Sequence, residues 1–223
     1  MSLIPVKLQH PITCPAIHAL AALADESEHD FGVALVGGAV RDAYHGVHTS
    51  NIADHDIALY SVPDEYEPVI GDRMVSAGYS EVARFSDEGD YADGQIWLVV
   101  KYGHPVFPNV DLLYHPQAST VQDVFQTFDF NINMFGAIVA DDQLTAFYGG
   151  ISTREAARLD GAAPDLLGDI IDQPQSVLQD NVGVDLKRVA KMVLIADLLD
   201  WAVPPRIRNR LIPAADLPTE PWS

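Results

Sequence analysis

Two aspartates separated by one residue, Asp54 and Asp56, form the pair with the clearest chemical potential in this sequence. They open the segment 54–60, whose polar and apolar residues alternate at its start, and this pattern predicts a strand. Residues two apart on a strand point to the same face, so both carboxylates would project together. A divalent cation relieves the repulsion between such neighbours, and hard carboxylate oxygens suit Mg²⁺ or Mn²⁺. A solvated loop is the alternative interpretation of the pattern.

A third acid, Asp111, lies in the segment 109–114, which is otherwise rich in residues that favour strands. A charge inside an apolar strand is costly unless it is paired or bound to a metal ion. An edge strand that points the carboxylate to water is the alternative. Asp111 is therefore a candidate third member of the carboxylate set.

A glycine pair, Gly37-Gly38, ends the apolar run 32–36 and precedes Arg41. Two glycines let backbone amides approach an anion closely, and a helix N-terminus favours negative charge. Arg41 can add a charge-assisted hydrogen bond to the same phosphate. These residues predict a phosphate site at a strand-to-helix turn, and the alternative is a tight turn without a ligand.

The elements that position these residues follow from hydrophobic periodicity and from the placement of Gly and Pro. We expect strands over 32–36, 54–60, 96–102, 109–114, 131–139 and 143–148. We expect helices over 12–24, 39–45, 63–77, 117–126, 152–159 and 183–201. The pattern changes after Gly150, from mixed elements to helices. The sequence therefore predicts an α+β domain over 1–150 and a smaller helical segment over 151–223.

Composition narrows the classes of function. The 223 residues carry 13 Lys and Arg against 32 Asp and Glu, a net charge of -19, and 48% of the chain is apolar. The apolar content predicts a folded core, and the charge disfavours extended binding to nucleic acid. The single cysteine, Cys14, excludes an intrachain disulfide. We expect a cytoplasmic protein, because no signal-like start or apolar run of about 18 residues occurs.

Five segments, in the same order, resemble signatures of the tRNA CCA-adding enzymes and bacterial poly(A) polymerases. Val36–Asp42 and Asp54–Ile57 resemble G-G-x-V-R-D followed by D-x-D-I. Thr127–Asn133 resembles R-R-D-F-T-I-N, and Asp142–Gly150 is similar to D-G-x-L-I-D-P-F-G-G. Val184–Arg188 resembles E-D-x-x-R. The resemblance covers residues 12–201 and implies membership of the DNA polymerase beta-like nucleotidyltransferases.

This resemblance implies a nucleotidyltransferase head with a mixed β-sheet flanked by helices, followed by a short helical neck. It implies transfer of a nucleoside monophosphate from an NTP, with ATP or CTP as the expected substrate. Asp54 and Asp56 would hold two Mg²⁺ (or Mn²⁺) ions, which clamp the attacking and leaving oxygens. Asp111 falls where the superfamily has a third carboxylate, which shares one ion and helps to deprotonate the attacking hydroxyl.

The resemblance also implies a set of nucleotide-binding residues. That set is Gly37, Gly38, Arg41, Asp129, Asn133, Asp185 and Arg188. Asp185 and Arg188 match the acid and the arginine that present a base-pair-like edge to the incoming base. Their spacing of three would place both on one helix face. An intrahelical salt bridge is the alternative for this pair.

The sequence departs from the family pattern at several positions. Thr127 and Phe128 replace the two arginines of R-R-D-F, Val184 replaces the glutamate of E-D-x-x-R, and Val47 stands where the family has a basic residue. We expect a short member without the tRNA-binding body and tail. Such a member suits a compact acceptor, namely a small molecule, a protein side chain or one RNA end.

Two other functions compete with this hypothesis. A degenerate nucleotidyltransferase that binds nucleotide without turnover would explain the lost arginines. It would not explain why three mutually repelling carboxylates are kept. An HD-type phosphohydrolase is suggested by His45, His48 and the doublet His55-Asp56. That class is wholly helical, whereas Asp56 runs into a segment that reads as a strand.

Overall fold

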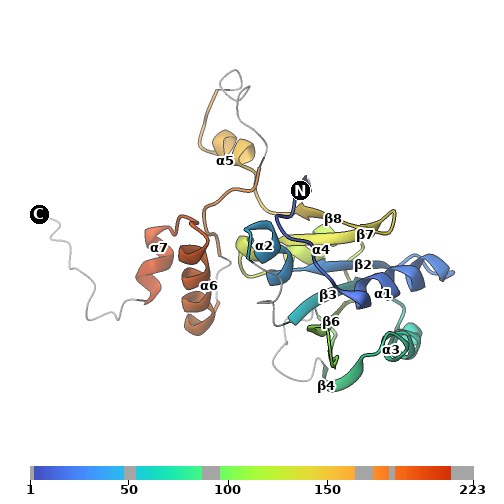
Figure 1. Ribbon diagram of the computed structural model, residues 1–223. Helices are drawn as coiled ribbons and strands as arrows, with labels where there is room; N and C mark the ends of the chain where they lie inside the picture. Colours follow the sequence, from blue (N-terminus) through green and yellow to red (C-terminus); the bar gives the residue numbers. More distant parts are fainter. Residues whose placement is uncertain (1–2, 48–53, 87–95, 164–172, 181–183, 212–223) are drawn as a thin grey trace, which may run out of the picture. The chain divides into compact units, whose positions relative to one another are not determined.

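The computed structural model describes residues 3–47, 54–86, 96–163, 173–180 and 184–211 (Figure 1). The chain divides into two compact units. The head unit comprises residues 1–127 and 133–150, and the second unit comprises residues 128–132 and 151–223.

An eight-stranded sheet forms the centre of the head unit, in the order β1-β8-β7-β2-β3-β6-β5-β4. The strands are β1 (Ile4–Pro5), β2 (Gly32–Val36), β3 (Asp54–Tyr60), β4 (Ser80–Ser86), β5 (Leu98–Gly103), β6 (Asn109–His115), β7 (Phe135–Ala140) and β8 (Gln143–Tyr148). The β3–β6 pair is parallel, and the other neighbouring pairs are antiparallel. The sheet is thus mixed, as expected, and Figure 1 shows β7, β2, β3 and β6 side by side.

Helices pack against this sheet. They are α1 (Pro15–Glu26), α2 (Gly38–Tyr44), α3 (Glu67–Ser76) and α4 (Val121–Gln126), with a 3-10 turn at Asp64–Tyr66. In α1, Ile17, Leu20 and Leu23 are buried at helical spacing, and the helix contacts β2 and α3. Pro15 opens α1, where its missing N–H has no intrahelical partner to lose. The expected sheet flanked by helices is confirmed.

The second unit contains α5 (Thr153–Leu159), α6 (Leu186–Leu198), α7 (Pro205–Arg208) and a 3-10 turn at Asn209–Leu211. One face of α6 is buried through Val189, Met192, Val193 and Ala196. Among the residues that the structure describes, no helix is both long enough and apolar enough to span a membrane.

Several expected elements differ at their ends. The strand expected from residue 131 begins at Phe135, because Asn131–Asn133 forms a 3-10 turn. The side-chain Nδ2 of Asn131 donates to the carbonyl of Val177, and its Oδ1 accepts from the N–H of Gln179. The backbone N–H of Asn131 donates to the carbonyl of Gln179 as well, so Asn131 is bonded to residues 177 and 179, which lie outside the sheet.

The helix expected over 183–201 begins at Leu186, and residue 183 lies outside the described residues. Two strands, β1 and β4, were not predicted at all. The β4 strand is an edge strand in which polar and charged residues interrupt the apolar pattern, so its sequence carries little periodicity.

Candidate active site

The three expected metal ligands are aligned by strand register. On the parallel β3–β6 pair, Asp56 lies directly opposite Asp111. On the antiparallel β5–β6 pair, Lys101 lies directly opposite the same Asp111. Residues in register share a face of the sheet, and Asp54 shares it because it lies two residues before Asp56. We call Asp54, Asp56, Asp111 and Lys101 the charged row.

Lys101 was missed by the sequence analysis. Its ammonium donates a hydrogen bond to Oδ2 of Asp111 and forms an ion pair with it. The sequence did contain a hint of this pair. Lys101 and Asp111 lie on the two strands of a predicted hairpin, where oppositely charged residues can face each other. The sequence does not fix the register that makes the two residues meet.

The side chains of the charged row are of the type that binds a divalent cation. Asp54 is exposed and Asp56 half-buried, so both offer hard oxygen ligands within reach of solvent. Yet among the described residues no three His, Cys, Asp or Glu side chains converge as a metal centre. Asp111 is bonded to Lys101 in this structure.

The glycine turn lies directly beside the acids. Gly37 has φ +76°, a left-handed conformation that favours glycine, and it occupies the N-cap position of α2. A Cβ atom on Gly37 would lie 3.3 Å from Oδ2 of Asp56. Its N–H donates to the carbonyl of Phe135 at 2.8 Å, so this amide fixes the turn to β7. The expected turn thus exists next to Asp56, although its first amide already has a partner.

Arg41 lies one helical turn further on and is buried. Its Nε donates to Oδ1 of Asp42 at 2.7 Å, and its Nη1 donates to Oδ1 of Asn133 at 2.8 Å. A Cβ atom on Gly38 would come within 3.4 Å of Nη2 of Arg41, so Gly38 leaves room for the guanidinium. The structure therefore brings Arg41 and Asn133 together, two residues expected to bind nucleotide.

His55 differs from the acids on either side of it. It is 2% exposed, and its Nδ1 has no hydrogen-bond partner among the residues that the structure describes. Burial lowers the pKa of His55 to about 4, although the nearby charge of Asp54 acts in the opposite direction. His55 is therefore neutral at pH 7 and belongs to the core.

The position of His55 on a strand also bears on the alternative of an HD-type phosphohydrolase. The His55-Asp56 doublet lies on strand β3 of a mixed sheet, not on a helix. His45 ends α2, where its Nδ1 lies 2.8 Å from the carbonyl oxygen of Arg41, and burial lowers its pKa. His48 lies outside the described residues. A wholly helical phosphohydrolase is excluded by the fold.

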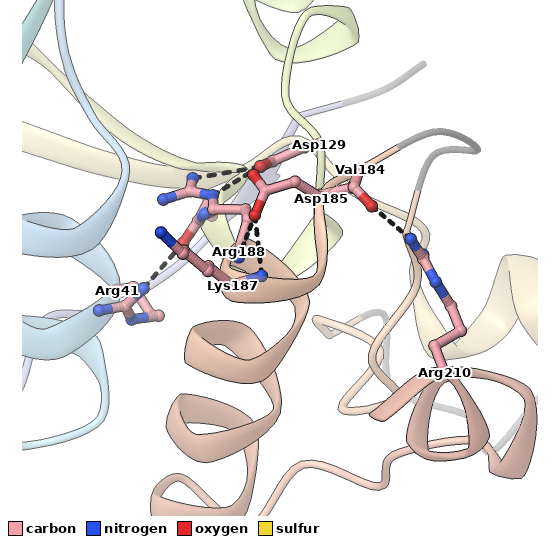
Figure 2. Close-up of polar contacts among 8 residues, drawn as sticks. Arg41, Asp129, Val184, Asp185, Lys187, Arg188 and Arg210 are labelled. Carbon is pink, nitrogen blue, oxygen red and sulfur yellow. Dashed lines mark hydrogen bonds and ion pairs between the residues drawn. The ribbon is translucent and has the colours of Figure 1, made fainter. Parts of the chain in front are cut away.

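In the second unit, Arg188 forms a two-point ion pair with Asp129 (Figure 2). Its Nε donates to Oδ2 at 2.6 Å, and its Nη2 donates to Oδ1 at 3.2 Å. The two residues are 59 positions apart in the sequence. Their planar groups match in geometry, which makes this one of the stronger classes of ion pair.

Asp185 has a different place from the one expected. It is the N-cap of α6, and its Oδ1 accepts from the N–H of Lys187 at 2.8 Å and of Arg188 at 3.0 Å (Figure 2). It thus lies at the start of the helix, three residues before Arg188 and within hydrogen-bond reach of its N–H. The guanidinium of Arg188 forms its two-point pair with Asp129. We call Asp129, Asp185 and Arg188 the arginine cluster.

A second acid–arginine group in this unit was also missed. The carboxylate of Asp180, 5% exposed, pairs with Arg206 and Arg210. Arg210 also donates to the carbonyl of Val184 (Figure 2). These contacts tie the chain before α6 to the segment after it. Nothing in the local sequence around Asp180 marks it as their partner.

The positions that depart from the family arginines have structural roles of their own. Thr127 is the C-cap of α4, and its hydroxyl donates to the carbonyl of Val124 at 2.8 Å. Phe128, the next residue, is half-buried. Neither residue can provide the positive charge that the family has there.

Comparisons with known proteins give the fold a name. Neither protein-family models nor curated protein sequences match the chain. A solved CCA-adding enzyme in complex with ATP matches with a TM-score of 0.53 and 14% identity over 89% of this chain and 42% of that one. The fold is that of a nucleotidyltransferase head. A CCA-adding enzyme in complex with CTP matches similarly, with a TM-score of 0.52 and 15% identity over 89% of this chain and 41% of that one.

This chain thus spans about two fifths of the length of the nucleotidyltransferases that it matches. At such low identity, the similarity establishes the architecture. The nucleotidyltransferase-like fold agrees with the family resemblance of the sequence motifs.

Proposed function

We propose that this protein is a metal-dependent nucleotidyltransferase, which transfers a nucleoside monophosphate from ATP or CTP to an acceptor hydroxyl. The observation that carries the proposal is the register that aligns Asp56 with Asp111 beside the Gly37 turn. Carboxylates next to a tight glycine turn combine cation ligands with close backbone approach to a phosphate. The fold is one in which a CCA-adding enzyme binds ATP or CTP, which supports this choice.

Asp54 and Asp56 are the residues that would hold Mg²⁺ or Mn²⁺, with Asp111 as the third ligand. Bound ions supply charge neutralisation at the phosphoryl oxygens and activation of the attacking hydroxyl. Asp111 lies in register beside Asp56. At this position its carboxylate would accept the proton of the acceptor hydroxyl. His55, neutral and buried between the two aspartates in sequence, anchors β3 in the core.

Arg41 is the residue that would bind the triphosphate, together with the turn at Gly37 and Gly38. Its guanidinium is held by Asp42 and Asn133, so little side-chain freedom remains to be lost on binding. Asn133 acts through Arg41 and is in this sense a positioning residue.

The arginine cluster would read the nucleobase. The guanidinium of Arg188 is held flat by two hydrogen bonds to Asp129, which presents its edge in a fixed orientation. Asp185 fixes the first turn of α6 and thereby the backbone that carries Arg188. Base preference between ATP and CTP would depend on this geometry.

Residues 1–150 would be the catalytic head and residues 151–223 a neck-like helical segment in a cytoplasmic enzyme. The net charge of -19 disfavours a long polyanionic partner. The acceptor would therefore be compact, namely a small molecule, a protein side chain or one RNA end.

Calorimetry with ATP, CTP, GTP and UTP, with and without Mg²⁺, tests the proposal. We expect metal-dependent binding of one or two of the nucleotides, which the D54A/D56A variant loses. D72A removes an exposed acid from α3 and serves as the control that keeps wild-type binding. Labelled NTP then identifies the acceptor. Binding of no nucleotide by the wild-type protein would contradict the proposal.

A second candidate is a nucleotide-binding module without turnover. The observation that favours it is the ion pair of Lys101 with Asp111, together with the absence of a three-ligand centre among the described residues. Such a module would bind NTP without metal dependence and transfer no nucleotide to any acceptor. The same calorimetric series separates the two functions.

A further inference from the structure

Lys101 places a positive charge in the charged row, and the proposed chemistry gives that charge no evident role. Register places the residues across the sheet in the order Asp56, Asp111, Lys101, on β3, β6 and β5. Asp111 therefore lies between a second carboxylate on one side and an ammonium on the other. Its side chain is 13% exposed, whereas that of Lys101 is 41% exposed.

The electrostatics of the charged row explain how the positive charge of Lys101 can stabilise it. Carboxylates on one face of a sheet repel each other, and each additional one makes ionisation of the others more costly. A neighbouring ammonium offsets part of this repulsion, as a metal ion would. Only four of the 13 basic residues in the chain are lysines, and one of them is paired with Asp111, whose side chain is 13% exposed.

Lysine is suited to a temporary role at this position. Its charge sits at the end of a flexible four-carbon chain, and it forms point contacts with no fixed fork geometry. Because the side chain is partly exposed, its ammonium can leave Asp111 for solvent at a small net cost. Asp111 is more enclosed and remains fixed by the strand that carries it.

We propose that Lys101 is a built-in counter-cation that competes with the divalent metal ion for Asp111. Without metal, the ammonium neutralises Asp111, and when metal binds at Asp54 and Asp56 the ammonium moves aside and releases Asp111 as the third ligand. Lys101 thereby weakens metal binding to the charged row. This inference rests on the proposed function, because it assumes that the charged row binds a metal ion.

The test measures Mn²⁺ binding to the full chain, without nucleotide, from the loss of the free Mn²⁺ signal in electron paramagnetic resonance. We expect K101M to bind Mn²⁺ about tenfold more tightly than wild type, because removal of a nearby positive charge favours a dication. K7M removes the same charge from an exposed position away from β5 and is expected to bind as wild type does. K101R keeps the charge and is expected to stay near wild type.

A second measurement does not depend on the affinity alone. The thermal midpoint of K101M without metal is expected to lie below that of wild type, because the row then lacks its counter-cation. Saturating Mn²⁺ is expected to raise the midpoint more in K101M than in wild type. K101Q, with a polar side chain, repeats both measurements if K101M does not fold.

The outcomes separate the inference from the function on which it rests. Equal or weaker Mn²⁺ binding by K101M, with binding still lost in D54A/D56A, would overturn the role of Lys101 and leave the metal site standing. Binding of Mn²⁺ by none of the variants would overturn both. Tighter binding in K101M but not in K7M would support the counter-cation.

Discussion

The charged row and the arginine cluster treat their acids in opposite ways. In the row, strand register holds three aspartates on one face with a single lysine. In the cluster, Asp129 has a matched guanidinium, and Asp185 accepts two backbone N–H groups at a helix start. The row gathers more negative than positive charge on one face, which a cation can relieve, whereas in the cluster Asp129 has a guanidinium of matching geometry. This difference supports the proposal that the head unit binds the metal ions and that the second unit orients the ligand.

The largest effect is expected from removing the excess charge of the row. We predict that D54A/D56A lowers nucleotide transfer roughly thousandfold, because the reacting phosphate loses its electrostatic stabilisation. The same variant relieves the repulsion between like charges and also loses the contacts of Asp56, so we expect only a small net change in the free energy of unfolding. Single-turnover assays with labelled NTP and urea unfolding measure the two effects. A large loss of stability would indicate that the contacts of these acids outweigh their mutual repulsion, and would remove the contrast with the cluster.

Cys14 provides a probe of the head unit alone. It is 1% exposed, and burial raises the pKa of its thiol from 9.0 to about 11. At pH 8 this rise lowers the thiolate population about hundredfold, so we expect alkylation by iodoacetamide to be at least that much slower than in denaturant.

The pH dependence of stability has a definite sign. Above pH 9 the unfolded thiol loses its proton first, so the free energy of unfolding is expected to fall between pH 9 and about 11. In R188A, the alkylation rate of Cys14 is expected to match wild type if the two regions are independent. A faster rate would show that the cluster stabilises the head.

The R188A variant tests how much the guanidinium of Arg188 stabilises the arginine cluster. Its removal leaves the half-buried carboxylate of Asp129 without its bidentate partner, and we expect a loss of about 1 kcal/mol in the free energy of unfolding, because solvent screens a pair this exposed. R188K keeps the charge but not the two-point geometry of the guanidinium, and its free energy of unfolding is expected to lie between those of wild type and R188A. A double-mutant cycle with D129A, followed by urea unfolding, measures the coupling. Additive effects would contradict the pairing.

D185A is expected to have the smallest effect. Loss of the N-cap acceptor destabilises α6 by about 1 kcal/mol or somewhat less at an exposed position. D185N keeps an acceptor oxygen and is expected to restore most of the stability. Urea unfolding compares the three proteins. If D185N were as unstable as D185A, the negative charge and not the cap bond would be the important feature.

Much of the head could be predicted because its signals are local. An apolar run, two glycines and an alternating segment predict β2, the turn and β3, and all three are present. The common face of Asp54 and Asp56 follows from the two-residue period of a strand. The N-cap role of Asp185 was missed, because the helix was expected to begin at residue 183, although an aspartate before a helical run is a helix start signal.

The partners across long separations could not be predicted. Register between β5 and β6 decides that Lys101 meets Asp111, and hydrophobic alternation alone does not set that register. The pair of Arg188 with Asp129 joins residues 59 positions apart, so no local pattern points to it. The sequence thus predicts which residues could do chemistry better than which neighbours restrain them.

The single parallel pair in the sheet has a consequence for the order of folding. Antiparallel neighbours such as β7 and β8 are joined by a tight turn, whereas β3 and β6 pair only after the chain between residues 61 and 108 has crossed over. Pairing across such a separation carries a loop-closure cost and is slow. We therefore expect the two carboxylate strands to dock late, so that a growing chain carries Asp56 long before it meets Asp111.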